Sequence, residues 1–426
     1  MCAKARQEVE SELYMSASPS IPRTGFDRFG LAPELRRAIA AAGFAEPRPI
    51  QAETIPAALA GRDVLGLAQT GTGKTAAFSL PLLQRLLGGA AGADPRALVL
   101  APTRELAAQI DKDVRSLAAY TRLRTLTIYG GVSAHGQRAG LRARPDVLIA
   151  CPGRLLDLHQ QRALRLGGVE ILVLDEADHM FDMGFLPDIR SSLAALPRRR
   201  QNLLFSATMP PAVRGLADAL LRNPHVVELA PAVPADTIEH ALYPVAEHRK
   251  RDLLEQLLAE DRCESAIVFT RTKHRARRLA QQLAQAGHRA VALQGNMSQS
   301  QRERAMAGFR GRRFDVLVAT DIAARGLDVS QVSHVINFDV PQIPEAYTHR
   351  IGRTGRAERS GTACTFVTGE DRRLVRAIED MLGAPIPRRE LAGFAEAPGA
   401  RAQARPAASR PGAARRAGPR RGARRA

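Results

Sequence analysis

The sequence predicts an α/β protein with two tandem domains, each built on a parallel sheet, and a disordered basic C-terminal tail. Two observations predict the domains. At 426 residues the chain is long enough for two or three domains that each bury a core. Short apolar runs alternate with helical patterns along most of that length, which is typical of parallel α/β sheets. A third observation, an arginine-rich end without acidic residues, predicts the tail.

The domain limits follow from changes in composition. Residues 1–24 are polar and uneven, and we expect them to be disordered. Residues 25–222 form the first predicted domain, and residues 223–237, with three prolines and no helical period, form the linker. The second domain then covers residues 238–380, and residues 381–426 form the mostly disordered tail.

The strand candidates occur in two series, and in the first series each strand ends in a polar motif. The first series lies at 63–68, 97–102, 124–129, 146–151, 171–175 and 202–206, and the second at 266–270, 290–294, 315–320, 334–338 and 363–367. Open α/β sheets bind ligands at the carboxyl ends of their strands, so these motifs are the candidate sites.

A glycine-rich turn follows the first strand. The segment AQTGTGKT predicts a turn leading into a helix that begins near Lys74, a geometry that points backbone N–H groups at phosphates. Lys74 would neutralise the β- and γ-phosphates, and the Thr75 hydroxyl would hold Mg²⁺. Of the five lysines, only Lys74 has Gly before it and Ser or Thr after it. The residues of this predicted ATP-binding loop are Ala68, Gln69, Thr70, Gly71, Thr72, Gly73, Lys74 and Thr75.

Three carboxylates stand at the end of a buried strand in the run ILVLDEAD. With a phosphate loop upstream, we interpret Asp175 as a Mg²⁺ ligand and Glu176 as the base that orients the attacking water. Asp178 is expected to link to neighbouring motifs. Ser206 and Thr208, after the next strand, stand where they could bond to these acids, although such residues usually cap a turn.

The segment upstream of the phosphate loop predicts recognition of the base. Its middle is a helix that starts at Pro33 and stops at Gly43. The Gln51 amide both donates and accepts, so it can match the amine and N7 of adenine. Phe26 could stack on the base, although without the phosphate loop it would be assigned to the core.

The late motif HRIGRTGR carries Arg353 and Arg356, and no second phosphate loop accompanies it. A solvated basic face is the default interpretation. The alternative is a pair of arginine fingers that complete the first domain's site when the domains close.

The composition constrains the partners. A formal net charge of +19 favours a polyanion, either nucleic acid or an acidic membrane surface. No apolar run is long enough to span a membrane, and no secretory signal is recognised, so a cytoplasmic protein is expected. The four cysteines are scattered and predict reduced thiols rather than a metal site. Aromatic residues make up only 4%, so binding must rely on phosphate contacts.

These motifs, in this order, resemble those of the DEAD-box RNA helicases over about residues 25–375. The segments VFTRTKH and DEADHMFDMGF are most similar to those of the bacterial RhlE-type subgroup. The resemblance implies two RecA-like domains that clamp ATP between them and RNA across both. It implies that Asp328 meets the ribose and that His349 ties the late motif to the acids. The RNA-binding residues it implies are Pro102, Thr103, Arg104, Gly131, Gly153, Arg154, Arg271, Gly295 and Thr320.

The chain departs from the family pattern at three places. Arg48 stands where Thr is usual, which puts a hydroxyl contact to the phosphate loop in doubt. Cys151 stands where another Thr is usual and removes a hydroxyl donor to RNA. Gln294 and Asn296 flank Gly295 where His and Asp are common, with modest effects expected.

The leading hypothesis is an RNA-stimulated ATPase that separates short RNA duplexes without sequence specificity, with ATP and Mg²⁺ as cofactors. An ATP-gated RNA clamp or annealing factor needs the same motifs, and a DNA translocase shares the two-domain plan. The nine arginines of residues 397–426 suggest a nonspecific RNA tether, against a merely solubilising tail. We expect a monomer; the sequence leaves other oligomers, protein partners and the physiological RNA open.

Overall fold

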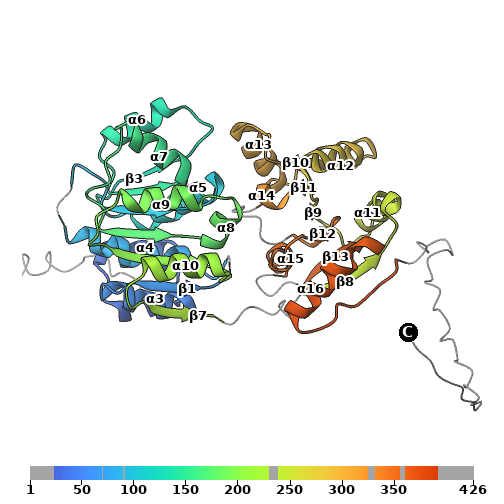
Figure 1. Cartoon of the computed structure of the whole chain (residues 1–426), viewed down its shortest axis with the longest axis horizontal. Coiled ribbons are helices and arrows are strands. Elements are labelled where there is room, and N and C mark those ends of the chain that lie inside the picture. The colour runs from blue at the N-terminus through green and yellow to red at the C-terminus, as the bar shows by residue number, and fades with distance from the viewer. Residues whose placement is uncertain are drawn as a thin grey trace, which may run out of the picture.

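The computed structural model contains two parallel sheets, each covered by helices on both faces (Figure 1). It describes residues 24–69, 71–89, 92–229, 238–324, 332–355 and 360–391. The first sheet has seven strands in the order β3-β4-β2-β5-β6-β1-β7, and the second has six in the order β10-β11-β9-β12-β13-β8. Every strand pair is parallel, so the predicted architecture is confirmed.

The first domain alternates strands with helices from its 3₁₀ helix onward. Its elements are η1 (Gly25–Phe29), α2 (Pro33–Ala41), α3 (Pro49–Leu59), β1 (Val64–Leu67), α4 (Lys74–Leu87), β2 (Ala97–Leu100), α5 (Arg104–Leu117), β3 (Thr125–Ile128), α6 (Ala134–Arg142), β4 (Val147–Ala150), α7 (Pro152–Gln160), β5 (Ile171–Leu174), α8 (Ala177–Asp182), α9 (Leu186–Ala194), β6 (Gln201–Ser206), α10 (Pro211–Leu220) and β7 (His225–Glu228).

The second domain follows the same plan. Its elements are β8 (Ile238–Pro244), η2 (Glu247–Arg249), α11 (Lys250–Leu258), β9 (Ala266–Phe269), α12 (Lys273–Gln285), β10 (Ala290–Leu293), α13 (Gln299–Arg310), β11 (Val316–Ala319), α14 (Asp321–Ala324), β12 (His334–Asn337), α15 (Pro344–Ile351), β13 (Gly361–Val367), η3 (Gly369–Asp371) and α16 (Arg372–Leu382).

Each sheet has a core on both faces because its central strands are apolar throughout. In the first domain, α2 to α5 pack on one face and α7 to α10 on the other. In the second, α13 to α16 cover one face, and α11 and α12 cover the other. Strands such as β2 and β5 are buried at every residue, as expected where helices cover both sides.

Local signals in the sequence set several helix ends. The predicted helix from Pro33 is confirmed as α2, with Pro33 in its first turn. After its end, Gly43 takes a φ of +74°, a left-handed conformation that favours glycine. In the described part of the chain, no helix is both long and apolar enough to cross a membrane.

Two predicted boundaries need correction. Residues 225–228, assigned to the linker, form β7, which pairs with β1 at the edge of the first sheet. The prolines on either side hid this short strand; residues 230–237 lie outside the described part. The second domain also extends beyond residue 380. The Leu242 N–H donates to Pro387 O and the Arg389 N–H donates to Leu242 O, both at 2.8 Å, and Ile386 is buried. Residues 1–23 and 392–426 lie outside the described part.

Candidate active site

The phosphate loop turns sharply between β1 and α4. Gly71 and Gly73 take φ values of +89° and +98°, which glycine adopts without strain. The Thr72 hydroxyl donates to Gln69 O at 2.8 Å, and α4 begins at Lys74 as predicted. The first N–H groups of α4 have no helical partner, so this end of the helix favours a bound anion. Thr70 lies outside the described residues.

Lys74 and Asp175 face each other beneath this loop. Both side chains are buried; Lys74 Nζ donates to Ala68 O at 2.9 Å and lies 3.9 Å from Asp175 Oδ1. Burial raises the pKa of Asp175, and Lys74 opposes that shift. Thr75 follows Lys74 in the first turn of α4. The predicted metal ligands therefore follow the carboxyl ends of β1 and β5, the two strands that flank β6 in the sheet.

Glu176 occupies a strained position. Its φ and ψ are both 54°, a left-handed conformation that is uncommon for a residue other than glycine. Glu176 Oε2 lies 2.8 Å from His179 Nδ1. Burial raises the pKa of Glu176, but His179, then Lys74 and Arg353, lower it further than burial raises it. The carboxylate is therefore ionised at neutral pH, as a base must be. His179 was missed in the sequence because nothing distinguishes it from a core histidine.

Asp178 joins the acids to the segment after β6. Its Oδ2 accepts from Thr208 N and Thr208 Oγ1, both at 2.9 Å, and its own N–H donates to Ser206 Oγ at 3.2 Å. Burial raises the pKa of Asp178, but His179 and His349 with other partners hold it below its ordinary value. The structure thus brings together the side chains predicted to couple these motifs.

Helix α15 and the residues after it bring side chains of the second domain close to Glu176 and Asp178. The rings of His349 and His179 meet edge to face, with centroids 5.1 Å apart. One ligand atom from each of Asp178, His179 and His349 lies within 4.8 Å of the others. Arg353 is 6% exposed, and its charge lowers the pKa of Glu176 across the domain boundary. Two residues assigned to the same site, Asp328 and Arg356, lie outside the described part of the chain.

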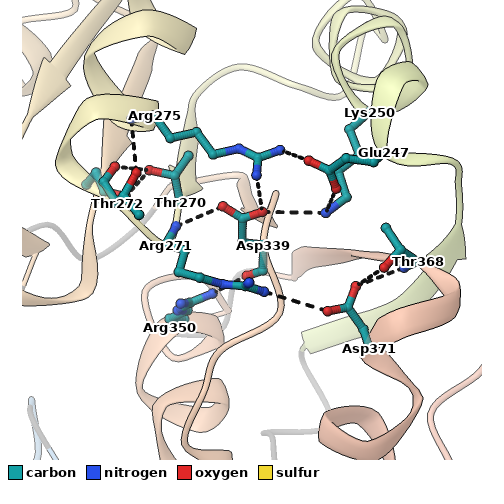
Figure 2. A network of polar contacts seen from close by, with 11 residues as sticks. Glu247, Lys250, Thr270, Arg271, Thr272, Arg275, Asp339, Arg350, Thr368 and Asp371 are labelled. Carbon is teal, nitrogen blue, oxygen red and sulfur yellow. Dashed lines mark hydrogen bonds and ion pairs between the residues drawn. The ribbon is translucent and has the colours of Figure 1, made fainter.

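Another arginine of the late motif anchors α15. Arg350 Nε and Nη2 donate to the two carboxylate oxygens of Asp321 at 2.6 and 2.7 Å, and Nη1 donates to Asp339 O at 2.7 Å. Figure 2 shows Asp339 at the centre of this network. Its carboxylate also accepts from the Arg271 N–H at 2.8 Å and pairs with Arg275 and Lys250. The sequence does not show which arginine of HRIGRTGR is structural, because that depends on which one is buried.

The two residues predicted to recognise the base, Phe26 and Gln51, make contacts within the protein. Phe26 is fully buried in the core and packs against Phe44 with ring centroids 6.1 Å apart, so it has no free face for adenine. Both ends of the Gln51 amide are engaged: Oε1 accepts from Arg48 N at 2.9 Å, and Nε2 donates to Gly73 O at 3.1 Å. In this structure Gln51 supports the phosphate loop.

Arg48 keeps a contact that its replacement of Thr had put in doubt. Its Nη1 donates to Gly71 O at 2.6 Å, so the guanidinium reaches the phosphate loop without a hydroxyl. The guanidinium contact thus stands where the hydroxyl contact was in doubt. The long Arg48 side chain therefore makes a hydrogen bond to the phosphate loop where a threonine would have used its short hydroxyl.

A cleft of about 460 Å³ runs between the two domains. Six predicted RNA-binding residues line it: Pro102, Thr103, Arg104, Gly153, Arg154 and Gly295. Thr103 caps α5 by accepting from Leu106 N at 3.2 Å. Cys151, which also lines the cleft, begins α7 without a side-chain cap, as expected where a thiol replaces a hydroxyl. This cleft is a candidate path for an RNA backbone.

The other predicted RNA-binding residues lie apart from the cleft lining. Gly131 abuts Arg104 so closely that a Cβ would collide with its guanidinium. Thr320 is 9% exposed and precedes α14. Arg271 is about half exposed and pairs with Asp371 at 3.7 Å (Figure 2).

An ion pair between the domains was missed in the sequence. Arg302 of α13 donates from Nε to Glu105 Oε1 of α5 at 2.5 Å, and from Nη2 to Ala323 O at 3.2 Å. Both ion-pair partners are largely buried at the wall of the cleft. A charged pair 197 residues apart carries no local signal, so only the fold reveals it.

Comparison with known proteins agrees with this arrangement. Residues 48–216 match the family model for the DEAD/DEAH box helicase, and residues 249–358 match that for the helicase conserved C-terminal domain. The chain is 46% identical over 355 residues to a DEAD-box ATP-dependent RNA helicase CshA of Bacillus licheniformis, covering 83% of this chain and 72% of the relative. It is also 46% identical over 346 residues to CshA of Geobacillus kaustophilus, covering 81% and 74%.

The fold is similar to that of Saccharomyces cerevisiae Dbp5 bound to RNA and ADP BeF3. The TM-score is 0.78 at 35% identity, and the match covers 86% of this chain and 96% of that one. The split site, the order of its motifs and these two comparisons lead to one conclusion. The chain belongs to the family of DEAD-box ATP-dependent RNA helicases.

Proposed function

We propose that this chain hydrolyses ATP to ADP and phosphate when RNA draws its two domains together, and that closure separates short RNA duplexes without sequence specificity. The observation that carries the proposal is the meeting of Glu176 with Arg353 and of His179 with His349. Acids from one sheet and cations from the other thereby share one site. A cleft lined by both domains lies beside it.

Each proposed catalytic residue has one task. Lys74 and the N-terminus of α4 neutralise the phosphates, and Glu176, kept ionised by His179, accepts a proton from the attacking water. Arg353 offsets the negative charge that develops on the transferred group. Because these groups stand on two domains, neither half hydrolyses ATP alone.

The residues present fit a magnesium ion. Asp175 is a buried carboxylate with a raised pKa, so a divalent cation beside it would favour its ionised form. Carboxylate and hydroxyl oxygens are the hard ligands that Mg²⁺ prefers, and Thr75 with Asp175 would hold it. When bound, the ion neutralises phosphate oxygens.

Backbone contacts support the lack of sequence specificity. The cleft offers arginines, a helix N-terminus and glycines, which meet phosphates and sugars rather than base edges. Recognition of RNA over DNA would require contacts to the 2′-OH. ATPase assays with matched RNA and DNA oligomers test this: equal stimulation would contradict the RNA assignment.

Steady-state ATPase assays with and without RNA test the split site. Glu176→Gln and Arg353→Ala should each abolish stimulated hydrolysis, while binding of a fluorescent ATP analogue persists. Arg165→Gln, an exposed arginine outside the site, is the control for lost charge. Normal hydrolysis by Arg353→Ala would show that the second domain does not complete the site.

A clamp or annealing factor remains the second candidate, because it needs the same closed site. Displacement of a short duplex at substoichiometric enzyme supports the helicase. Retention of RNA for as long as ATP stays unhydrolysed, without strand release, supports the clamp.

We further propose a cytoplasmic monomer. The RhlE-type subgroup stays a prediction from VFTRTKH and DEADHMFDMGF, since the relatives described above carry the name CshA.

A further inference from the structure

A second basic cavity lies on the first domain, between α9 and α10. It has a volume of about 530 Å³, and four arginines line it: Arg190, Arg198, Arg200 and Arg222. Figure 1 shows α9 and α10 on the same face of the first sheet, where they share one core cluster. Asn202, near the start of β6, also lines the cavity.

The positive charge in this cavity is partly offset by Asp63, which raises the pKa of Arg200 from outside the cavity, against the lowering by burial. No carboxylate lines it, and among the described residues none of its four arginines forms an ion pair. Asp63 is near, but its Oδ1 accepts from Asn202 N and its Oδ2 from Arg222 N, both at 2.8 Å. That carboxylate also holds the backbone in place, and the four arginines that line the cavity outnumber it.

Two buried polar atoms at this cavity have no hydrogen-bond partner. They are Arg200 Nε, a donor, and Asn202 Oδ1, an acceptor. Asn202 is 3% exposed, and its amide nitrogen is already directed to Asp63 and to Leu220 O, which fixes the side chain. Burial lowers the pKa of Arg200, and the like charge of Arg222 lowers it further. Buried polar groups are normally satisfied by protein or by ordered water, so these two atoms show unused hydrogen-bonding capacity beside the cavity.

The cavity lies at the opposite edge of the sheet from the ATP site. Asn202 stands at the start of β6, whereas Ser206, bonded to Asp178, ends the same strand. Four residue steps along a strand separate them by roughly 13 Å. All strands of this sheet are parallel, so the ATP site and the cleft between the domains lie at the carboxyl edge. The arginines therefore do not belong to either site.

We propose that this cavity binds a small, multiply charged phosphate ligand, with the chemistry of an inorganic oligophosphate or a nucleotide. The four guanidinium groups match several phosphate oxygens, since arginine donates to phosphate in pairs. The concave shape and the distance from the cleft favour a small molecule over an RNA backbone. This inference does not depend on the proposed helicase activity.

Isothermal titration with tripolyphosphate tests the proposal. A Lys74→Ala background removes the main cation of the phosphate loop, so that binding at the second cavity is isolated. The cavity variant adds Arg200→Gln and Arg222→Gln to this background. The control variant adds Arg122→Gln and Arg165→Gln instead, which removes the same charge from two exposed arginines elsewhere on the domain. A milder Arg198→Gln variant leaves the half-buried Arg200 in place and guards against misfolding.

One tripolyphosphate should bind per Lys74→Ala chain. The affinity should fall at least about tenfold in the cavity double variant, less in Arg198→Gln, and stay unchanged in the control, as expected for the loss of charge-assisted hydrogen bonds. GTP distinguishes the sources: tighter binding than tripolyphosphate identifies a nucleotide, and weaker binding an oligophosphate. Equal affinities in the cavity and control variants would overturn the proposal. So would a variant that loses affinity for single-stranded RNA alone.

Discussion

Single side chains decide how the phosphate loop is held. Arg48 is the N-cap residue of α3 and Gln51 lies in its first turn, and both donate to carbonyl groups of the phosphate loop, at Gly71 and Gly73. These bonds fix the loop between its two left-handed glycines. A loop fixed in advance loses less conformational entropy when ATP binds, so the segment before α3 influences affinity at a distance from the phosphates.

Replacing Arg48 tests this support. Arg48→Ala should raise the KM for ATP roughly fivefold, because an exposed charge-assisted hydrogen bond contributes about 1 kcal/mol, and should leave kcat nearly unchanged. Steady-state ATPase assays at saturating RNA measure both constants. Arg48→Lys keeps the charge and is the matched control. An unchanged KM in Arg48→Ala would show that the contact to Gly71 O does not order the loop.

The thiols present a second test at this scale. Burial raises the pKa of Cys151, Cys263 and Cys364 to about 12 in each case. At pH 8 the thiolate fraction is then about one in ten thousand, and the thiolate is the reactive form. We expect these three cysteines to resist iodoacetamide until the protein unfolds. Peptide mass spectrometry after labelling, with and without denaturant, measures this; rapid labelling of Cys151 in the native protein would contradict it.

At the scale of elements, the sequence predicted most of the sheets and one wall of the site. Apolar runs identify β1 to β6 because helices cover both faces, and the phosphate loop and acids follow strands β1 and β5 directly. β7 was missed because prolines flank a short edge strand. The sequence did not decide the place of Phe26, which lies in the core, because an aromatic residue near a nucleotide motif can belong to either core or site. His179, Arg350 and the pair of Glu105 with Arg302 depend on tertiary contacts that no local pattern reveals.

Helices α5 and α13 hold the domains together through that pair. Arg302→Glu should reduce RNA-stimulated kcat by about tenfold or more, since it places two carboxylates together in a largely buried contact. ATP binding to the first domain should persist. The double variant Glu105→Arg with Arg302→Glu should recover part of the activity, and ATPase assays on all three variants complete the cycle. Additive losses without recovery would mean that the two residues act separately.

For the whole molecule, the two sheets contribute different halves of one site, and the C-terminal segment contributes positive charge. Formal charge is +19 over the chain, and the last thirty residues, 397–426, hold nine arginines and no acid. RNA bound across the cleft would be attracted by these arginines as well as by the residues of the two domains. Association with a polyanion then has two components, a structured cleft and a nonspecific electrostatic attraction that salt screens.

Deleting residues 397–426 separates these components. The Kd for a single-stranded RNA should rise, and the slope of log affinity against log salt should decrease by about 0.7 for each phosphate that the tail no longer neutralises. Fluorescence anisotropy at several salt concentrations measures both. Nine substitutions of Arg by Gln at the same positions control for length. An unchanged salt slope would mean that the tail does not touch RNA.

The hydrogen bonds of residues 387 and 389 with Leu242 cover part of the edge of the second sheet. β8 ends the second sheet, and an uncovered strand edge offers its N–H and C=O groups to any other chain. The segment after α16 occupies part of that edge, and Ile386 fastens it in the core. A chain shortened to residue 380 would lose this cover and gain a route to edge-to-edge aggregation, whereas one that ends at residue 391 would keep it.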